Sequence, residues 1–301
     1  MQPLVVTHTS RRKIPWVVYI SGVATTPVNQ DPSAPFARWL RFHSFLGPPQ
    51  QPSEQDLAFC RDIAGGWIRE RGAPRVLSLG VTPGYYGLPW PEGTGMLAVD
   101  VSQAMIDNVW PGENDTALCA NWLSMDLPPG SRDIALCDGG LPILDYPRAQ
   151  HDLVRILHRV LSDEGLCLFR MFVLPEEREA PEAVLRDFVE GEIGNLSCLV
   201  LRMNMALQTS ADEGVVIGKA YDAIWSVPRL DEVLARLGWS PEHMTLIEEC
   251  RGITSQWHVL TLRETLDMFC LYPGGFRVQE VRTPSYDLGE RCPTVALAKI
   301  P

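Results

Sequence analysis

The sequence predicts an α/β fold built on a mainly parallel sheet. Between residues 75 and 173, short apolar runs alternate with segments whose apolar residues recur at helical spacing. Runs that are apolar throughout are typical of parallel strands buried on both faces. Their alternation with amphipathic helices places helices on both sides of the sheet. The chain has 301 residues, of which 46% are hydrophobic, and is therefore long enough to bury such a core.

A helix is expected before the first strand. Residues 1–35 are rich in Thr, Pro and Ser, and only 16–20 could form a strand among them. Ser53 is a good N-cap for a helix whose apolar residues recur at helical spacing up to Gly72. Residues 1–72 are therefore interpreted as an N-terminal segment with lead-in helices.

Five strands should follow and form the core between residues 73 and 175. The predicted strands are 75–81, 96–101, 116–122, 132–137 and 165–173. Ser102 is expected to cap the helix after the second strand. The clearest helical spacing in the chain lies at 148–161, between the fourth and fifth strands.

The rest of the chain is predicted to form an insertion and a closing hairpin. Residues 176–262 have the pattern of helices and loops, which predicts a helical insertion covering the substrate. Ser240 and Thr261 are expected to cap two helices in this part of the chain. Residues 263–301 should return to the core as a closing helix and two strands that could pair antiparallel. These strands are predicted at 276–282 and 294–300.

Composition excludes several classes of partner. The net charge of −11 argues against binding to a nucleic-acid backbone. No apolar run approaches the roughly 20 residues needed to cross a membrane. A signal peptide at residues 16–23 is conceivable, but a strand leading into a loop suits that segment better. A small molecule or a partner protein is the better expectation, in a cytoplasmic setting.

The cysteines and histidines do not form a metal-binding pattern. No CxxC pair occurs among the eight cysteines, and the six histidines are scattered. Cys119, Cys137 and Cys167 lie inside apolar runs and should be buried free thiols, as in a reducing compartment. We therefore expect neither a disulfide framework nor a metal site.

The ligand is expected at the carboxyl ends of the strands. Gly80 begins the loop after the first strand, and Asp100 ends the second strand 20 residues later. A carboxylate there can accept hydrogen bonds from both hydroxyls of a ribose, and a glycine lets the backbone approach the ligand closely. By itself, this pairing suits a nicotinamide dinucleotide as well as S-adenosylmethionine (SAM).

The first loop argues against a dinucleotide. A pyrophosphate needs GxGxxG at the start of a proper helix. Here several prolines and glycines lie between residues 81 and 95, and at most one helical turn fits between Pro83 and Leu88. SAM carries no phosphate, so a nucleotide-dependent oxidoreductase is the weaker alternative.

Several motifs occur in a characteristic order. They are LGPPQQPSEQDL, VLSLGVTPGYYGLPWP, AVDVSQAMIDNVWPG, NWLSMDLP, DIALCDGG, GLCLFRMF and YDLGERCPTVALAKI. Together they resemble class I SAM-dependent methyltransferases, most of all a bacterial subgroup whose first motif is LGVTP. The resemblance covers roughly residues 36–175 and 270–301. It implies a Rossmann-like methyltransferase fold with a seven-stranded, mainly parallel sheet, an antiparallel last strand and a helical lid insertion.

The resemblance also implies SAM as the cofactor and methyl transfer to a small-molecule O, N or C nucleophile. It places a cofactor contact at the end of each of the first four strands. These residues are Gly80, Val81 and Thr82, then Asp100, Val101 and Met105, then Asn121 and Trp122, and finally Asp138 and Gly139. Asp100 would hold the ribose, and Asn121 stands where the family often has an acidic residue that recognises adenine.

Two residues are candidate catalytic groups. Asp138 could orient the acceptor or act as a base, although Asp-Gly-Gly is also an ordinary turn composition. His258 is the plausible imidazole base of the insertion. Alignment of two reactants alone can contribute roughly 7–11 kcal/mol, so methyl transfer does not require a base. Other side chains of the insertion could line an apolar acceptor pocket, although each more commonly packs the insertion onto the sheet. They are Met203, Met205, Tyr221, Trp225 and Trp257.

Two departures from the family pattern support an alternative. GVTPG, starting at Gly80, replaces the usual GxGxG loop, and Asn121 replaces an acidic residue. The chain could therefore be a catalytically inactive or repurposed methyltransferase-fold protein that binds SAM or a partner as a scaffold. The sequence permits a homodimer through the N-terminal segment without indicating one.

Overall fold

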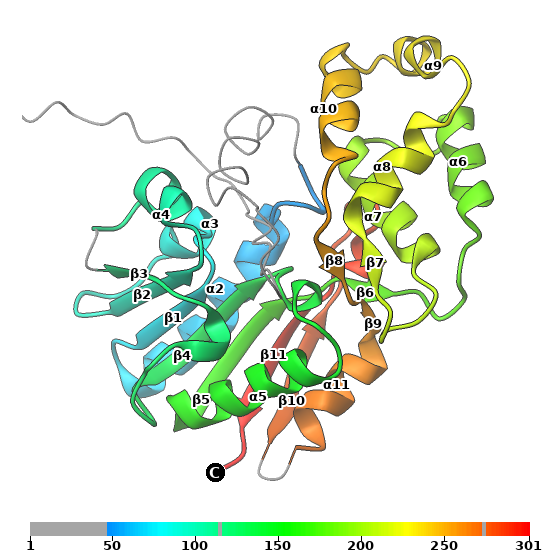
Figure 1. Ribbon diagram of the computed structural model, residues 1–301. Coiled ribbons are helices and arrows are strands. Elements are labelled where there is room, and N and C mark those ends of the chain that lie inside the picture. Colours follow the sequence, from blue (N-terminus) through cyan, green and yellow to red (C-terminus); the bar gives the residue numbers. More distant parts are fainter. Residues whose placement is uncertain (1–46, 114–115, 273–274) are drawn as a thin grey trace, which may run out of the picture.

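The computed structural model describes residues 47–113, 116–272 and 275–301. A seven-stranded sheet runs through it in the order β10-β11-β5-β4-β1-β2-β3, with helices around it (Figure 1). The candidate strand at 16–20 lies outside the described residues. The strands are β1 (Arg75–Leu79), β2 (Gly95–Asp100), β3 (Ala117–Cys119), β4 (Arg132–Asp138), β5 (Leu161–Arg170), β10 (Phe276–Arg282) and β11 (Thr294–Lys299).

The strand directions confirm the predicted fold class. Strands β1 to β5 pair in parallel, and β11 runs antiparallel to both of its neighbours, β5 and β10. A mainly parallel sheet with an antiparallel last strand is the Rossmann-like methyltransferase arrangement that the sequence predicts. The order also places the carboxyl ends of β2, β1, β4 and β5 in one row.

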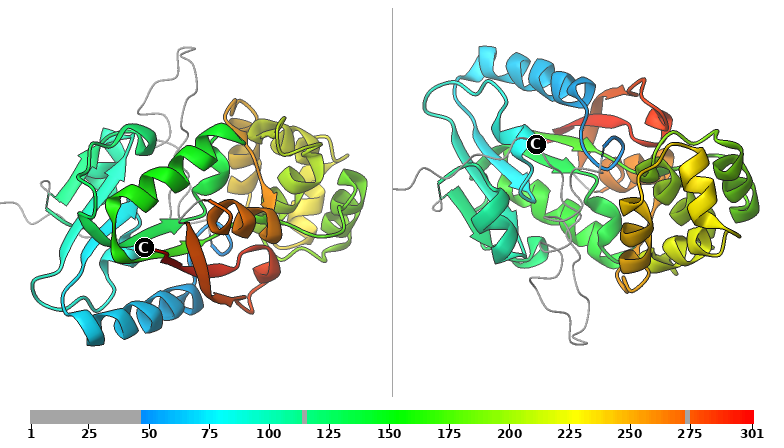
Figure 2. Two further views of the ribbon diagram at one scale, coloured as in Figure 1. Left: turned by 90° about the horizontal axis from the view of Figure 1, so that it is seen from below. Right: turned by 90° about the horizontal axis from the view of Figure 1, so that it is seen from above.

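Helices cover both faces of the sheet, as Figure 2 shows for α2 and α5. The side chains of β1 alternate between the two faces: Val76 packs with α2, while Leu77 and Leu79 belong to the larger core on the side of α5. This alternation follows from the two-residue period of a strand. The helices next to the sheet are α2 (Glu54–Arg71), α3 (Pro83–Tyr86), α4 (Gln103–Val109), α5 (Arg148–Val160) and α11 (Leu262–Cys270).

The segment after β5 is helical, as its pattern predicts. Its helices gather next to the carboxyl end of β5 (Figure 1). They are α6 (Pro181–Glu190), α7 (Leu196–Leu207), α8 (Ile217–Trp225), α9 (Leu230–Arg236) and α10 (Glu242–Cys250). Two short strand pairs that we did not expect anchor them. These are β6 (Val173–Leu174) with β9 (Leu260–Thr261), and β7 (Val215–Val216) with β8 (Gln256–Trp257).

Three of the four predicted helix N-caps are confirmed. Ser53 and Thr261 each form a complete capping box, and the Ser102 hydroxyl accepts a hydrogen bond from the third residue of α4. The prediction for Ser240 is wrong, because Pro241 is the N-cap of α10 and no side chain caps that helix. The Ser240 hydroxyl instead lies 3.1 Å from Nδ1 of His243.

Several strand boundaries also differ from the prediction, and the first strand ends at Leu79 rather than at Val81. The third strand ends at Cys119, because the Asn121 side chain caps a 3-10 turn, η3 (Trp122–Ser124). The fifth strand starts directly after α5 and ends at Arg170 rather than at Val173. Of the three cysteines expected to be buried, Cys119 is exposed, since it lies on an edge strand.

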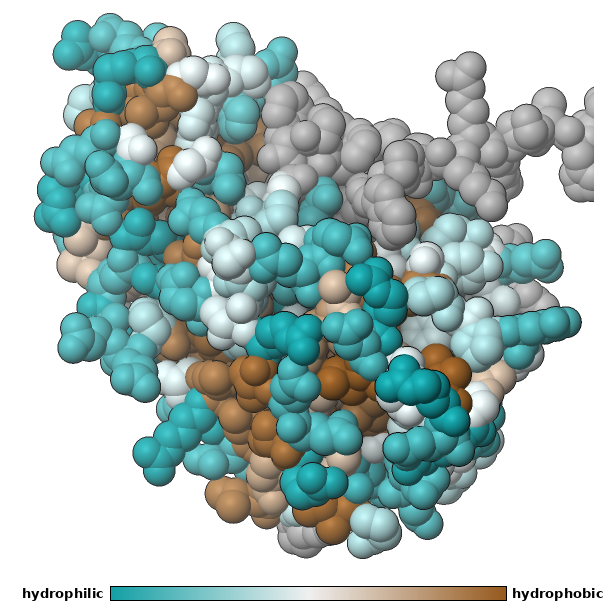
Figure 3. All heavy atoms as spheres, turned by 180° about the vertical axis from the view of Figure 1, so that it is seen from behind, coloured by the Kyte–Doolittle hydropathy of each residue, from teal (hydrophilic) through white to brown (hydrophobic). Residues whose placement is uncertain are grey.

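All eight cysteines are free thiols. Among residues 47–113, 116–272 and 275–301, no group of three or more His, Cys, Asp or Glu side chains could hold a metal ion. No helix in the same described ranges is both long and apolar enough to cross a membrane. Figure 3 shows that hydrophilic residues cover most of the face seen from behind, with hydrophobic patches in its lower half.

Candidate functional site

The register of the sheet brings the predicted site residues into one row. Leu79 at the end of β1 pairs with Val99 on one side and with Cys137 on the other. The residue that follows each of these three is therefore at the same edge. Those residues are Gly80, Asp100 and Asp138, so three of the predicted cofactor positions meet at the carboxyl ends of the strands.

Asp100 has a buried carboxyl group, and one of its two oxygens accepts no hydrogen bond from the described residues. Its Oδ1 accepts a hydrogen bond from the Ser102 amide at 2.8 Å, whereas Oδ2 has no hydrogen-bond partner among the described residues. Burial raises the pKa of Asp100 to about 7, although the backbone amides of Ser102 and Val81 act in the opposite direction. The side chain thus presents an unused acceptor at the position predicted for a ribose.

Gly80 forms a sharp turn beside that oxygen. Its φ is +89°, in the region that favours glycine, and a Cβ at this position would lie 3.8 Å from Oδ2 of Asp100. The turn leads into α3, which has only four residues, so the expectation of at most one helical turn is confirmed. A helix this short provides no N-terminal site for a pyrophosphate.

The first-loop residues Val81 and Thr82 are nearly inaccessible. Val81 is 0% exposed and packs with Met105 in a small cluster beneath β2. Thr82 precedes α3 without capping it through its side chain. In contrast, Val101 is 39% exposed directly after Asp100. The structure therefore leaves Val101 accessible to a ligand, whereas Met105 belongs to the core.

Trp122 forms a wall between two loops. Its indole Nε1 donates to the Val99 carbonyl at 2.7 Å, which fixes the ring under the sheet edge. A Cβ added at Gly80 would lie 3.8 Å from the ring, and one at Gly140 would lie 2.7 Å from it. Asn121, next to it, uses Oδ1 to accept from the Leu123 amide at 2.8 Å. An amide oxygen has two lone pairs, so a second hydrogen bond can still be accepted there.

Asp138 is paired with Arg170, which ends the neighbouring strand β5. The guanidinium Nε donates to Oδ1, and the two side chains are 1% exposed or less. Burial lowers the pKa of Arg170, but the facing carboxylate outweighs it, and the pKa lies well above the ordinary value. Gly139 follows with a φ of +61°, and a Cβ there would lie 2.6 Å from the Phe172 ring. Glycine is therefore required directly after Asp138.

His258 lies against the loop that follows β4, although 120 residues separate it from Asp138. Its backbone amide donates to the Pro142 carbonyl at 2.7 Å. Its ring Nδ1 lies 2.8 Å from the Ala211 carbonyl, and Nε2 is buried without a hydrogen-bond partner among the described residues. The Nε2 atom is 3.7 Å from the Asp145 carboxylate. The structure thus places the backbone of His258 beside the loop after β4, while its ring faces Ala211 and Asp145.

The apolar side chains of the insertion mainly pack. Met203, Met205, Tyr221 and Trp257 are buried in the large core cluster, and Trp225 is partly buried against it. These side chains therefore pack the insertion, which is the commoner of the two roles considered for them, the other being to line an acceptor pocket.

Arg170 is the site residue that the sequence analysis missed. It stands inside the apolar run 165–173, which was interpreted only as a strand. A single charged residue in a strand buried on both faces needs a counter-charge, and this signal could have pointed to Asp138. Its other partners could not have been found, because Pro49 and Tyr286 are 121 and 116 residues away in the sequence.

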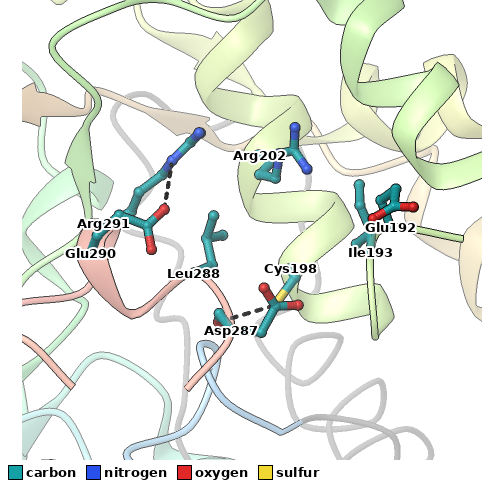
Figure 4. Close-up of a pocket in the computed structure, with 8 residues that line it drawn as sticks. All are labelled: Glu192, Ile193, Cys198, Arg202, Asp287, Leu288, Glu290 and Arg291. Carbon is teal, nitrogen blue, oxygen red and sulfur yellow. Dashed lines mark hydrogen bonds and ion pairs between the residues drawn. The ribbon is translucent and has the colours of Figure 1, made fainter. Parts of the chain in front are cut away.

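A cavity of about 160 Å³ lies where the insertion meets the β10–β11 connection (Figure 4). Glu179 connects two arginines of its wall: it lies 2.5 Å from Arg202 and 2.5 Å from Arg291. Partial burial raises the pKa of Glu179, but these two guanidiniums outweigh it and hold the pKa below its ordinary value. The cavity is lined by Glu192, Ile193, Cys198, Arg202, Asp287, Leu288, Glu290 and Arg291.

Comparison with known proteins supports the fold. No protein-family model matches the sequence, and no curated protein matches it. A Rhodobacter sphaeroides structure with the provisional description Zn-dependent alcohol dehydrogenase has a TM-score of 0.53 at 13% identity, covering 87% of this chain and 97% of that one. A SAM-dependent methyltransferase from Methanosarcina mazei has a TM-score of 0.48 at 14% identity, covering 79% and 97%.

A third similar structure is the 1,6-didemethyltoxoflavin-N1-methyltransferase of Burkholderia thailandensis, with 1,6-didemethyltoxoflavin and S-adenosylhomocysteine bound. Its TM-score is 0.47 at 14% identity, covering 92% of this chain and 94% of that one. Several of the similar structures are thus SAM-dependent methyltransferases. At such low identities the likeness concerns the fold alone, and the function must be argued from the site.

Proposed function

We propose that the chain is a class I SAM-dependent methyltransferase, of the subgroup with an LGVTP first motif, that acts on a small-molecule O, N or C nucleophile. The unpartnered, buried Oδ2 of Asp100 carries this proposal. A ribose brings two hydroxyl donors to that oxygen, and Gly80 leaves room for it. The single turn of α3 disfavours a dinucleotide and places no restriction on SAM, which has no pyrophosphate.

We propose that the other predicted contacts belong to the same ligand, although the side chains of Val81 and Thr82 are buried beside Gly80. Gly80, Val81 and Thr82 would line its amino-acid end, and the exposed side chain of Val101 would offer an apolar contact to the adenine. Met105 would support this contact from the core, Asn121 would accept from the adenine amino group, and Trp122 would form the wall behind the cofactor. When bound, SAM supplies a methyl group on a sulfonium. The chain itself aligns the reactants and keeps water out.

Of the two candidate catalytic residues, we propose His258 as the base. If Nδ1 donates to the Ala211 carbonyl, Nε2 keeps an acceptor lone pair. Asp138 is already paired with Arg170, so we propose that it orients the reactants, together with the tight Gly139 turn that follows.

The chain organisation belongs to the same proposal. Residues 1–72 would lead into a SAM-binding core at 73–175, a helical lid at 176–262 would cover the acceptor, and 263–301 would close the core. We propose a cytoplasmic protein that uses neither nucleic acid nor a membrane, in keeping with its net charge of −11. A homodimer through the N-terminal segment falls largely outside the described residues and stays a prediction.

Calorimetric titration with SAM and S-adenosylhomocysteine tests the proposal. We expect micromolar binding that falls by roughly tenfold or more in Asp100→Ala, because hydrogen bonds to a charged group contribute about 1.5–3 kcal/mol. Asp133→Ala is the matched control. It removes a buried carboxylate at the start of β4, away from the carboxyl ends of the strands, and should leave binding unchanged. No binding by the wild-type chain would refute the methyltransferase, and binding of NADH instead would favour the oxidoreductase.

A catalytically inactive, scaffolding role is the second candidate. The observation that favours it is the Trp122 ring, which lies against Gly80 and Gly140 in the space between two cofactor-facing loops. If this ring blocks the cofactor, Trp122→Ala should bind SAM while the wild-type chain does not. Stronger binding by the wild-type chain than by Trp122→Ala would exclude that role for the ring.

A further inference from the structure

The cavity drawn in Figure 4 uses none of the residues at the strand ends where the cofactor is proposed to bind. One of its walls comes from α7 and the turn before it, and the other comes from the β10–β11 connection. Its volume of about 160 Å³ is smaller than the roughly 300–1,000 Å³ of pockets that enclose drug-sized ligands. The cavity therefore has room for a small molecule, or for one end of a larger one.

Arg291 brings a buried donor without a hydrogen-bond partner to the wall of this cavity. Its side chain is 9% exposed, and Nη2 lies 2.5 Å from the Glu179 carboxylate. Nη1 lies 4.0 Å from the sulfur of Met205, which is a weak acceptor. Nε is buried and donates no hydrogen bond to the described residues, since its ion pair with Glu290 has a distance of 3.6 Å (Figure 4). An acceptor atom on a ligand would satisfy this donor.

The second guanidinium of the wall is already bound by carboxylates. Nη2 of Arg202 lies 2.5 Å from Glu179 and 2.7 Å from Asp187. Asp187 is also 3.2 Å from the exposed guanidinium of Arg186. Glu179 thus holds both guanidiniums of the wall in place, and Arg202 has less capacity for a ligand than Arg291.

Three exposed carboxylates line the solvent side of the cavity. Glu192 belongs to one wall, and Asp287 and Glu290 belong to the other. With the two carboxylates that bind Arg202, the described residues bring five carboxylates and three guanidiniums to this junction, a formal charge of −2. This charge favours a cation, because a further carboxylate would be repelled. The acceptor that Arg291 needs should therefore be uncharged.

We propose that this cavity binds a primary ammonium group with an uncharged carbonyl next to it. The ammonium would face the exposed carboxylates, and the carbonyl oxygen would accept from Nε of Arg291. Ile193 and Leu288 offer an apolar surface for a small side chain, and the Cys198 thiol stays neutral because burial raises its pKa to about 12. The amino end of a peptide and a small α-amino amide both have this chemistry. The inference goes beyond the proposed function and does not depend on binding of the cofactor.

Calorimetry of the full chain without cofactor tests the ligand with four probes near neutral pH. Alaninamide has both groups, ethylamine lacks the carboxamide, propionamide lacks the ammonium, and alanine has a carboxylate instead of the amide. Alaninamide should bind about tenfold more tightly than ethylamine or propionamide, the effect of one hydrogen bond to a charged group. Alanine should also bind more weakly than alaninamide, because its carboxylate is repelled. Absent binding of alaninamide, equal binding of propionamide, or tighter binding of alanine would overturn the proposal.

Variants place the ligand in the cavity. Arg291→Lys keeps the positive charge and removes the Nε donor, so alaninamide should lose its preference over ethylamine, while binding of ethylamine shows that the variant is folded. Glu192→Gln combined with Asp287→Asn should weaken binding of alaninamide about two- to fivefold, and less at high salt. Glu248→Gln is the control, since it removes an exposed carboxylate of α10 that does not line the cavity.

Two results with these variants would refute the site. One is a preference for alaninamide that survives Arg291→Lys, and the other is unchanged binding in the double variant. Should Arg291→Lys not fold, the double variant carries the test, because both of its side chains are exposed.

Trialanine amide and its N-acetylated form separate the two sources of the ligand. If trialanine amide binds at least as tightly as alaninamide, the cavity takes the amino end of a peptide. If it binds tenfold or more weakly, the cavity takes a small α-amino amide. Acetylation removes the ammonium, so an acetylated peptide that binds as tightly as the free one would overturn the proposal.

Discussion

The buried carboxyl of Asp100 should make the unliganded protein less stable as the pH rises. Its pKa in the folded chain is about 7, against an ordinary value of 3.8. Between these two pH values, Asp100 is protonated in the folded state and ionised in the unfolded state. The cost of the buried charge is therefore absent below about pH 4, grows between pH 4 and pH 7, and is complete above pH 7.

The size of the effect follows from the same two values. A difference of about three pKa units corresponds to about 4 kcal/mol, at about 1.4 kcal/mol per unit. Asp100→Asn removes the charge and keeps the shape of the side chain. Between pH 5 and pH 8 the wild type should thus lose about 3 kcal/mol of unfolding free energy relative to Asp100→Asn.

Urea denaturation of both proteins at several pH values between 5 and 8 measures this difference. Asp133→Asn provides a contrast of opposite sign: burial raises the pKa of Asp133, but the Arg75 guanidinium outweighs it and the pKa is lowered. At pH 8, Asp133→Asn should be less stable than the wild type, whereas Asp100→Asn should be more stable than the wild type. A stability difference between the wild type and Asp100→Asn that does not change with pH would refute the reasoning.

The cofactor should reverse the trend. If ribose hydroxyls donate to the ionised form of Asp100, as we propose, bound SAM should favour loss of the proton. Affinity for SAM should then rise between pH 6 and pH 8, with proton release detectable by calorimetry in buffers of different ionisation enthalpy. A flat affinity profile would mean that Oδ2 of Asp100 does not contact the ligand.

Three further outcomes follow from the packing. Gly139→Ala should lower the unfolding free energy by about 1–3 kcal/mol in urea, because the residue has a φ of +61° and the new Cβ would lie 2.6 Å from Phe172; an unchanged midpoint would contradict this. Ser53→Ala removes the capping box with Asp56 and should cost about 1 kcal/mol by the same assay, whereas no loss would mean that water replaces the cap. In the native protein Cys119 should react first with a thiol reagent, since it is exposed while six other cysteines are buried; mass spectrometry that finds a buried thiol labelled first would show that the fold opens.

Much of the fold could be predicted because it depends on local chemistry. The apolar runs gave the strand order along the chain, and Ser53, Ser102 and Thr261 cap helices as their neighbours in sequence require. Asn121 was harder, since its side chain ends β3 by capping a turn, and the pattern of apolar residues carries no sign of this. Short polar side chains offer the backbone an alternative to the strand ladder.

The site could be predicted only where its residues follow a strand end. Gly80 and Asp100 are found this way, because each closes an apolar run at the ligand-binding edge. Arg170 lies within such a run instead of following it, so the position of a strand end does not indicate it. Its contacts with Pro49 and Tyr286 join segments far apart in sequence. The packing of His258 against the loop after β4 is likewise a tertiary contact that no local pattern encodes.

Two aspartates at the same edge show why position alone does not assign a role. Asp100 and Asp138 end strands on either side of β1, and both are buried. Burial raises the pKa of Asp138, but the facing Arg170 guanidinium acts in the opposite direction and holds its Oδ1. Asp100 has only backbone donors, so burial raises its pKa, and neutral hydroxyls suit it best. A ligand that spans both strand ends would therefore meet a lone carboxyl group at β2 and an ion pair at β4.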